Sequence, residues 1–316
     1  MTTLSVIVPV YNEQDSLTEL ATGILAHIPD DIELVQLLFV DDGSTDDSFD
    51  VLRALCKEHP VIGAIRLPVN RGKAEALDVG FRHAMGDIVI TMDADLQDDP
   101  AEIPRFIDKL SEGYDLVSGW KGARQDPWHK TWPSKLFNAV VARVFKIPLR
   151  DFNCGFKAYR RRLVDQLSLY GELHRYIPVL AHSEGATMVD LPVQHHPRRH
   201  GQSKYGAGRL FKGFLDMLTV LVTTRFLKRP LHLFGGVGLI FAFAGGAILI
   251  YLAALWIGGL RPIGNRPLLF YGMAFLILGV QIVSLGIVAE LFLKFNHRRE
   301  KPVTSVMLGC VKEHSG

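Results

Sequence analysis

The chain has 316 residues, of which 48% are hydrophobic and 22% are charged, and its formal net charge is +2. This length and composition exclude a small scaffold that depends on disulfides or metals, and they exclude a disordered chain of high net charge. The mean hydropathy of +0.17 is high for a soluble enzyme, which indicates that one part of the chain is much more apolar than the rest.

Charge is distributed unevenly along the chain. Residues 1–120 contain 8 basic and 23 acidic residues, whereas residues 121–229 contain 20 basic and 7 acidic ones. Residues 230–293 contain three charged residues, Arg261, Arg266 and Glu290. A net charge near zero therefore conceals an acidic first part, a basic middle and an apolar last part.

The first 120 residues alternate short apolar runs with amphipathic stretches. The apolar runs predict strands at 4–10, 34–40, 62–67, 87–92 and 115–119. The amphipathic stretches predict helices at about 14–27, 45–58, 72–85 and 101–111. Strands that alternate with such helices form βαβ units, which predicts a mostly parallel sheet covered on both faces. Ligands of such sheets bind beyond the carboxyl ends of the strands.

Two amphipathic segments follow, at about 134–146 and at 206–229. Apolar residues at helical spacing would by themselves favour two helices of a soluble core. The basic residues Arg209, Lys212 and Arg225, together with the apolar part that comes next, favour helices that lie on a membrane surface.

The apolar part predicts two membrane-spanning helices, at about 231–257 and 268–293. Residues 230–260 and 267–289 contain no Asp, Glu, Lys or Arg, and each stretch exceeds the roughly 20 residues that a spanning helix needs. Basic residues precede the first helix and follow the second, so both ends of the pair are expected in the cytoplasm. A buried hairpin of a soluble protein is the alternative.

These features predict a cytosolic domain at 1–205, an interfacial helix at 206–229, a hairpin at 230–294 and a cytoplasmic tail at 295–316. The three cysteines have neither the spacing of a zinc site nor that of a disulfide framework, which fits a reducing compartment. No signal peptide is expected, because Pro9 and Asn12 interrupt the first apolar run.

Two carboxylates follow the strand predicted at 87–92, in the string Asp93-Ala94-Asp95-Leu96-Gln97. Acids at this spacing beyond a strand can share a hard divalent cation, which prefers oxygen ligands and bridges phosphates, and Gln97 adds an amide oxygen. A solvated acidic turn is the alternative for so short a pattern. The next residues, Asp98, Asp99 and Pro100, fit the start of the following helix.

A second acidic string, Asp41-Asp42-Gly43-Ser44, follows the strand predicted at 34–40. A carboxylate there can accept hydrogen bonds from a nucleobase or a ribose. Ser44, Thr45 and Asp46 are better explained as a cap of the next helix. The chain contains neither G-x-G-x-x-G nor G-x-x-x-x-G-K-[ST], so neither dinucleotide binding nor a P-loop is supported.

Four strings in chain order carry a resemblance to family 2 glycosyltransferases of GT-A fold, and more narrowly to polyprenyl-phosphate glycosyltransferases. They are Pro9-Val10-Tyr11-Asn12-Glu13, Asp41-Asp42-Gly43-Ser44, Asn70-Arg71-Gly72-Lys73 and Asp93-Ala94-Asp95-Leu96-Gln97. The resemblance covers about residues 3–225, and the two spans match the bacterial members. It implies an α/β fold: a Rossmann-like GT-A catalytic domain, then amphipathic interfacial helices and a two-helix transmembrane hairpin.

The resemblance also implies roles for individual residues. Nucleotide-sugar binding falls on Pro9, Tyr11, Glu13, Asp41, Lys73 and Asp93, and a Mg²⁺ or Mn²⁺ site falls on Asp93, Asp95 and Gln97. Asp95 and Asp151 are the implied catalytic residues, Asp151 at the position often assigned as the base. The stretch 199–205 matches a mobile loop near the acceptor phosphate.

A lipid monophosphate as acceptor would account for the basic middle of the chain. The candidates to bind it are Lys121, Arg124, Lys130, Arg199, Ser203 and Lys204. A phosphate monoester has a second pKa of about 6 and is largely dianionic near pH 7. Asp151 is therefore expected to position the acceptor or a metal at least as much as it removes a proton.

Two basic clusters have plain alternatives. His195, His196 and His200 match the spacing of no common metal site, and they fit a basic solvated loop. The run 160–162, three arginines, fits lipid headgroups or the solvated start of a helix.

The sequence thus predicts an inverting glycosyltransferase that moves one sugar from a UDP- or GDP-linked donor to a polyprenyl phosphate, undecaprenyl or dolichyl. It would work at the cytosolic face of the inner or plasma membrane, with the bilayer but no nucleic acid as a partner. Glycines in the spans permit a homo-oligomer. One alternative is a processive polysaccharide synthase, whose typical Q-x-x-R-W stretch and additional spans do not occur here. The other is a non-catalytic membrane scaffold, against which the intact carboxylates argue.

Overall fold

A computed structural model of the chain describes residues 1–120, 138, 141–143, 145, 147–171, 173–194, 230–259, 267–296 and 306–309. The chain divides into two compact units. The first unit is Met1–Met217 together with Pro302–Gly316, and the second is Leu218–Lys301.

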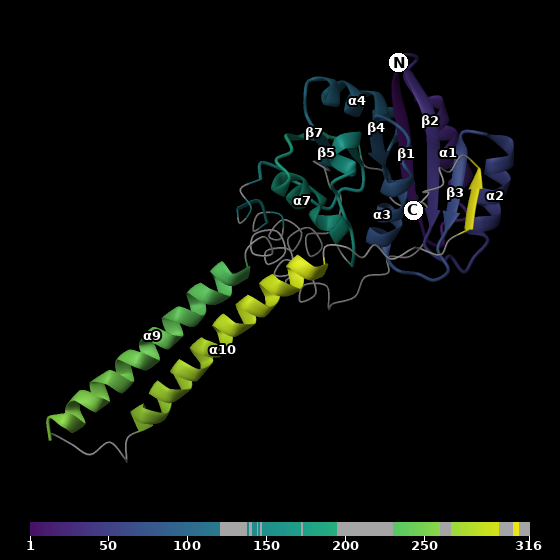
Figure 1. Cartoon of the computed structure of the whole chain (residues 1–316). Coiled ribbons are helices and arrows are strands. Elements are labelled where there is room, and N and C mark those ends of the chain that lie inside the picture. The colour runs from purple at the N-terminus through teal and green to yellow at the C-terminus, as the bar shows by residue number, and fades with distance from the viewer. Residues whose placement is uncertain are drawn as a thin grey trace. The chain divides into compact units, whose positions relative to one another are not determined.

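The first unit is built on one mixed, mostly parallel sheet (Figure 1). The strand order is β7-β5-β6-β4-β1-β2-β3-β8. The strands are β1 (Thr2–Val10), β2 (Ile32–Asp41), β3 (Ile62–Arg66), β4 (Ile88–Thr91), β5 (Leu116–Trp120), β6 (Lys157–Arg160), β7 (Met188–Pro192) and β8 (Val306–Gly309). Strands β6 and β8 run antiparallel to their neighbours, whereas β1, β2, β3 and β4 are mutually parallel.

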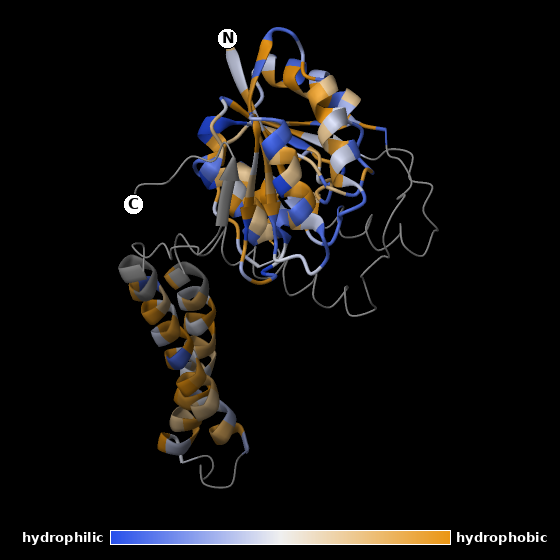
Figure 2. Cartoon of the chain, turned by 90° about the vertical axis from the view of Figure 1, so that its right-hand side faces the viewer, coloured by the Kyte–Doolittle hydropathy of each residue, from blue (hydrophilic) through white to orange (hydrophobic). Residues whose placement is uncertain are grey.

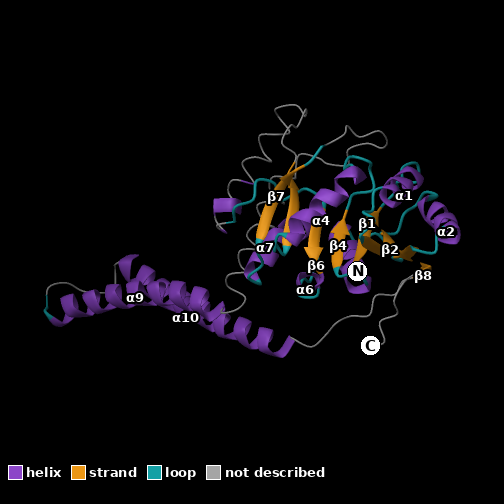
Figure 3. Ribbon diagram, turned by 90° about the horizontal axis from the view of Figure 1, so that it is seen from above, coloured by secondary structure: helices purple, strands orange, loops and turns teal. Residues whose placement is uncertain are grey.

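Helices cover both faces of this sheet, as the view from above shows (Figure 3). They are α1 (Leu17–Ala26), α2 (Ser48–Glu58), α3 (Lys73–His83), α4 (Ile103–Ser111), α6 (Arg161–Val164) and α7 (Ile177–Ser183), with short 3-10 turns η1 (Pro100–Glu102) and η2 (Leu173–Tyr176). Because strand side chains alternate between faces, Val6 and Val8 pack with α1, α2 and α4. On the other face α3 lies so close that a Cβ on Gly80 would be 2.4 Å from Ile7 Cγ2.

The five strands and four helices expected in the first 120 residues are all present. Strands β6, β7 and β8 were not expected. Strand β6 has only four residues, and three of them are buried, including a lysine, so it lacks the apolar alternation that reveals a longer strand. Of the amphipathic segment 134–146, the structure describes 138, 141–143 and 145, which are helical. The segment 206–229 lies outside the described residues.

Strand β8 belongs to the part that was expected to be a tail. It follows the apolar helices in the chain, yet it pairs antiparallel with β3, from Gly63↔Gly309 to Arg66↔Val306. It covers the edge of the sheet that β3 would otherwise expose. The chain thus returns to the first unit after it has passed through the second.

The second unit contains two long apolar helices, α9 (Pro230–Ile257) and α10 (Pro267–Asn296). Both are long and apolar enough to cross a membrane, and Figure 2 shows apolar residues along their length. Large apolar side chains are exposed on both, with Phe243 81% and Phe270 67% accessible. A hairpin in the core of a soluble protein would bury such side chains, so the pair fits a transmembrane hairpin better.

The two helices meet through glycines. A Cβ on Gly279 of α10 would lie 2.4 Å from the amide nitrogen of Ala242, and one on Gly245 of α9 would lie 2.5 Å from that of Leu276. The backbones can approach this closely only because these positions carry no side chain. At the start of α9, the amide of Leu231 donates to Glu290 Oε2 at 3.3 Å, so an acidic residue of α10 binds an otherwise unpaired helix amide.

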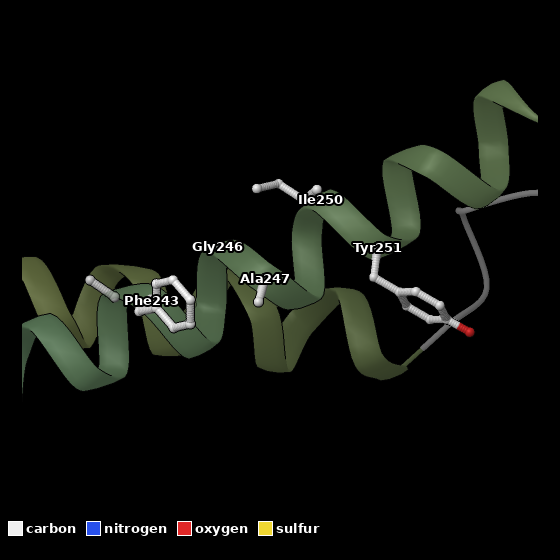
Figure 4. A pocket seen from close by; sticks show the side chains of 6 residues that line it. Phe243, Gly246, Ala247, Ile250 and Tyr251 are labelled. Atoms are coloured by element: carbon white, nitrogen blue, oxygen red, sulfur yellow. The ribbon is translucent and has the colours of Figure 1, made fainter.

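The outer side of α9 is different. Phe243, Ile250 and Tyr251 stand around the small residues Gly246 and Ala247 and form a shallow apolar groove (Figure 4). A Cβ added to Gly246 would meet no atom within 4 Å. This position therefore offers a control for the glycines between the helices.

We predict that Gly279→Val forces α9 and α10 apart, because the new side chain would overlap the backbone of α9. The cost of such overpacking is about 1–3 kcal/mol. Thermal unfolding of the detergent-solubilised protein, followed by circular dichroism, measures it. Gly246→Val is the matched control and should melt as the wild type does; equal melting of all three proteins would contradict the close packing.

Candidate active site

The candidate site lies at the carboxyl ends of the central strands. Strands β1, β2 and β4 are parallel and in register, with Val10 beside Asp41 and Ile7 beside Thr91, so the loops that follow them leave the sheet at the same edge. Strand β6 is antiparallel to β4, with Lys157 beside Thr91, so the segment that precedes it arrives at this edge. One edge therefore gathers the segments 11–13, 41–44, 93–97 and 151–156.

The first two of these loops are bound to each other. The amide of Asn12 donates to Ser44 Oγ at 2.9 Å, and the amide of Thr45 donates to Asn12 Oδ1 at 2.8 Å. The N-cap residue of α2 is Asp47, whose side chain makes no cap bond, and Asp46 before it accepts the amide of Ser48, the first residue of α2, at 3.0 Å. Ser44 and Thr45 instead hold the loop after β1, a role that depends on a contact over 30 residues away.

The two adjacent acids after β2 serve different partners. Asp41 is fully buried, accepts the amide of Ser44 at 2.9 Å and lies 3.3 Å from Arg66 Nε. Asp42 accepts the amides of Arg71 and Gly72 at 2.7 and 2.8 Å and so holds the loop before α3. Burial raises the pKa of Asp42; the two amides oppose this and the nearby carboxylates add to it.

The remaining residues expected to line the nucleotide pocket lie along the same edge. Pro9 is buried within β1, where it pairs with Val40. Tyr11 and Glu13 are half-buried in the loop after β1, and the amide of Glu13 donates to Ser48 Oγ at 2.9 Å.

Lys73, the first residue of α3, forms an ion pair with Asp93. Burial alone would lower the pKa of Lys73, but the contact with Asp93 and the charges of Asp98 and Asp95 outweigh it, and the pKa is raised. Lys73 is therefore a firmly protonated ammonium among carboxylates. The Asn70–Lys73 string and the Asp93–Gln97 string, which the sequence separates, meet at this pair.

Asp93 stands directly against Gly155. A Cβ at Gly155 would lie 2.5 Å from the Cγ and both carboxylate oxygens of Asp93. The chain turns sharply after Asp95, where Leu96 has a φ of 57°, and the amide of Gln97 donates to Asp95 Oδ1 at 3.3 Å. A side chain at position 155 would thus displace the first carboxylate of the pair.

The oxygen ligands at Asp93, Asp95 and Gln97 suit a hard divalent cation. Within the described part of the chain, no three His, Cys, Asp or Glu side chains are grouped as a metal site. A cation here would accordingly rest on two carboxylates, an amide oxygen and oxygens of a bound ligand such as a diphosphate. These ligands fit a metal ion whose remaining coordination positions are filled by oxygens of the substrate.

The expectation for Asp98 was wrong. Asp99 does cap the next element, since it accepts the amide of Ala101 at 2.9 Å. Asp98 is instead buried, with 2% of its surface accessible, and its charge acts on Lys73. The sequence could not separate the two adjacent acids, because their difference lies in which way the backbone turns.

Asp151 lies in the turn that leads into β6. It is 2% accessible, and its Oδ1 accepts the amide of Asn153 at 3.0 Å. Its charge acts on the buried ammonium of Lys157, as does that of Asp93. The candidate base Asp151 and the candidate metal ligand Asp93 therefore both act on the same group, the ammonium of Lys157.

Sequence reasoning missed two residues here, Lys157 and His174. Lys157 on β6 is buried; burial lowers its pKa and the cation of Lys73 lowers it further, against the opposing carboxylates of Asp151 and Asp93. Burial and the cations of Lys73 and Arg175 lower the pKa of His174, in η2, to about 2. The sequence feature that could have identified Lys157 as a site residue was its charge directly after the Asp151–Phe156 string. The sequence contains no such feature for His174.

The acceptor-binding candidates lie outside the described residues, as does the histidine cluster. They are Lys121, Arg124, Lys130, Arg199, Ser203 and Lys204, with His195, His196 and His200. The arginine run at 160–162 is described, and its side chains bind within the domain: Arg160 to the carbonyls of Leu110 and Tyr114, Arg161 to Asp165 and Ala84, Arg162 to Asp115. These internal bonds account for the run without lipid.

Comparison with known proteins gives consistent results. The pattern of the family described as Glycosyl transferase family 2 matches residues 5–168. An undecaprenyl-phosphate 4-deoxy-4-formamido-L-arabinose transferase of Edwardsiella ictaluri is 36% identical over 95% of this chain and 91% of its own. A dodecaprenyl-phosphate galacturonate synthase of Rhizobium johnstonii is 35% identical over 93% of this chain and 89% of its own.

Among solved structures, the fold is similar to glucosyl-3-phosphoglycerate synthase from Mycobacterium tuberculosis. The complex of that protein with Mn²⁺, uridine diphosphate and glucosyl-3-phosphoglycerate aligns with a TM-score of 0.55 at 21% identity, over 71% of this chain and 80% of the other. At this identity the likeness concerns the fold alone. The expected GT-A fold is confirmed.

We predict that Gly155→Ala weakens the binding of Mn²⁺ and nucleotide by at least about tenfold, because the methyl group displaces the Asp93 carboxylate. Isothermal titration with Mn²⁺ and uridine diphosphate measures the loss. Thermal unfolding of the same variant serves as the control for the fold. Wild-type affinity in the variant would contradict the contact between Gly155 and Asp93.

His174 should make stability depend on pH. Its pKa is about 2 in the folded protein and near 6.5 in an unfolded chain, so only the unfolded state gains a proton below pH 6.5. The contribution of neutral His174 to the free energy of unfolding is therefore present above pH 6.5. It is lost as the pH drops below that value, by up to about 2 kcal/mol between pH 7.5 and 5.

The variant His174→Phe should lose this part of the pH dependence, as measured by chemical unfolding at the two pH values. His182→Asn replaces an exposed histidine of α7 and is the control. The prediction is wrong if His174→Phe loses as much stability on acidification as the wild type.

Proposed function

The chain belongs to glycosyl transferase family 2, and from this premise we propose that it transfers a single sugar from a nucleotide sugar to a polyprenyl phosphate. The observation that carries the proposal is the identity of 35–36% over nearly the whole chain with two enzymes whose names contain a prenyl phosphate acceptor. The two names specify different sugars, so experiment has to determine which sugar this chain transfers. The apolar hairpin supports a lipid acceptor.

The donor would bind at the carboxyl ends of β1, β2 and β4. Pro9, Tyr11, Glu13 and Asp41 would line the nucleotide pocket, Asp41 mainly by holding its loop, since its carboxylate already binds Ser44 and Arg66. Lys73 would meet the diphosphate, because it is a protonated ammonium at the start of a helix beside Asp93.

Mg²⁺ or Mn²⁺ would be held by Asp93, Asp95 and Gln97. The metal would supply positive charge to the diphosphate as it leaves. The chain's own contribution is to hold the two carboxylates in place, through Lys73 on one side and Gly155 on the other. Asp95, at the sharp turn marked by Leu96, would complete the metal site next to the anomeric carbon.

The acceptor phosphate would approach from the side of Asp151. A lipid monophosphate is largely dianionic at neutral pH and can attack without losing a proton first. Asp151 would orient it for in-line attack opposite the diphosphate, with inversion at the anomeric carbon. The basic residues Lys121, Arg124, Lys130, Arg199 and Lys204 would neutralise the charge of the phosphate, and the hydroxyl of Ser203 would donate a hydrogen bond to it.

The proposed topology places the catalytic domain in the cytoplasm and the turn between α9 and α10 on the far side of the inner membrane. Two observations support it. Basic residues flank both ends of the hairpin. Strand β8, which follows α10, pairs with β3 of the domain that precedes α9, so both ends of the hairpin connect to the same domain.

The test is transfer of labelled sugar from a panel of UDP- and GDP-sugars to undecaprenyl phosphate, with Mn²⁺ or Mg²⁺ present. We expect one donor to yield a lipid-linked monosaccharide. Asp93→Asn should lower the rate by at least about a hundredfold, because it removes a carboxylate from the metal site. Asp87→Asn, at the opposite end of β4 where Asp87 binds Thr3, is the matched control and should keep its activity.

Other outcomes identify the alternatives. A polymer in place of a single transferred sugar would indicate a processive synthase. Binding of nucleotide without transfer from any donor would indicate a scaffold, and either result would overturn the proposal.

A further inference from the structure

The turn before β6 is anchored by a series of carbonyl groups. The carbonyl of Gly155 accepts Thr91 Oγ1 at 2.8 Å, and that of Phe156 accepts the amide of Gly119 at 2.9 Å. The carbonyl of Cys154 accepts the ammonium of Lys157, which reaches back over the turn. Three consecutive carbonyls thus hold the turn to β4, β6 and β5.

The hydrogen bond to the carbonyl of Asp151 is weak by comparison. Ser118 Oγ lies 3.5 Å from the carbonyl oxygen of Asp151, which is at the limit for a hydrogen bond. The turn is held on both sides of Asp151: the amide of Arg150 before it donates to Asp190 Oδ2 at 2.9 Å, and the three carbonyls after it bind β4, β5 and β6. Among these three anchors, the one at Cys154 comes from a charged group, and charged donors form stronger hydrogen bonds than neutral ones.

We propose that Lys157 is a positioning residue for the transfer reaction: its buried ammonium holds the turn 151–155 so that Asp151 faces the site while Gly155 supports Asp93. The proposal rests on the proposed function for the reaction that is measured. It assigns a task to a buried charge that neither the nucleotide pocket nor the metal site uses.

The surroundings of Lys157 explain why a cation is kept there at some cost. The residue is 2% accessible, and burying a lysine is unfavourable unless carboxylates or carbonyls surround it. The carboxylates of Asp151, in the turn, and of Asp93, in the loop after β4, act on it through their charges. A neutral side chain could fill the space, but it would leave the carbonyl of Cys154 without its donor and two neighbouring carboxylates without a shared cation.

The same strand offers a matched control in Arg160. Its guanidinium donates to the carbonyls of Tyr114 at 3.0 Å and Leu110 at 2.8 Å, so Arg160 also ties backbone carbonyls to β6. It lies at the opposite end of the strand, away from Asp93 and Asp151. Arg160→Met should lower stability as Lys157→Met does, without touching the site.

The experiment compares Lys157→Met, Lys157→Gln and Arg160→Met in the full-length protein. For Lys157→Met we expect kcat to fall by about tenfold or more while the KM of the donor changes by less than about threefold, because the donor still binds but Asp151 is no longer held. Lys157→Gln keeps a hydrogen-bond donor without its charge, so its kcat should lie between that of Lys157→Met and that of the wild type. Arg160→Met should keep its kcat.

Hydrogen exchange gives a readout that does not require turnover. The amide of Asn153, which donates to Asp151 Oδ1, should exchange slowly in the wild type and in Arg160→Met, and faster by about tenfold in Lys157→Met. Fast exchange of this amide in the wild type would overturn the proposal whether or not the variants fold. Equal kcat in Lys157→Met and Arg160→Met would also overturn it.

The two proposals fail in different ways. If the wild type transfers no sugar from any donor, the proposed function fails, while exchange at Asn153 still decides whether Lys157 orders the turn. If the wild type is active and Lys157→Met is equally active, the transferase stands and the role of Lys157 falls.

Discussion

The structure depends on the compensation of negative charge at one edge of a sheet. Asp93 pairs with the ammonium of Lys73, on which the charges of Asp95 and Asp98 also act, and the charges of Asp93 and Asp151 act on the ammonium of Lys157. Carboxylates in such a partly buried place repel one another, and without cations among them some would take up protons. The two lysines keep the edge negatively charged, as a site for a divalent cation and a diphosphate requires, while limiting the repulsion that the fold must bear.

The reversed strand β6 makes this arrangement possible. A sheet of parallel strands presents one set of loops at its carboxyl edge, and each loop leads into a helix. Because β6 runs the other way between β4 and β5, the segment before it arrives at the edge directly and needs no crossover. The segment that contains the candidate base Asp151 thereby reaches the candidate metal ligand Asp93, with Gly155 as the point of contact between the two segments.

The second unit of the chain is suited to lipid instead of water. Helices α9 and α10 expose apolar side chains and contact each other through glycines, a packing that suits lipid, where burial of apolar surface drives association little. Strand β8 then returns the chain to the sheet of the first unit. A soluble catalytic fold and an apolar hairpin are in this way joined at both ends of the hairpin, which fits an enzyme whose donor is water-soluble and whose acceptor is a lipid.

The sequence by itself determined the parallel α/β core, the apolar hairpin and the acidic strings at the strand ends, because each depends on periodicity or on neighbours in the chain. It did not reveal β6, since four residues with a buried lysine show no strand pattern, or β8, which lies beyond the hairpin. Nor did it separate Asp98 from Asp99. Only the tertiary structure decided that Lys157 and His174 lie near Lys73 and Asp93, close enough for their charges to interact. The physical reason is that the order and direction of strands, which no local pattern encodes, set the distances between residues so far apart in the chain.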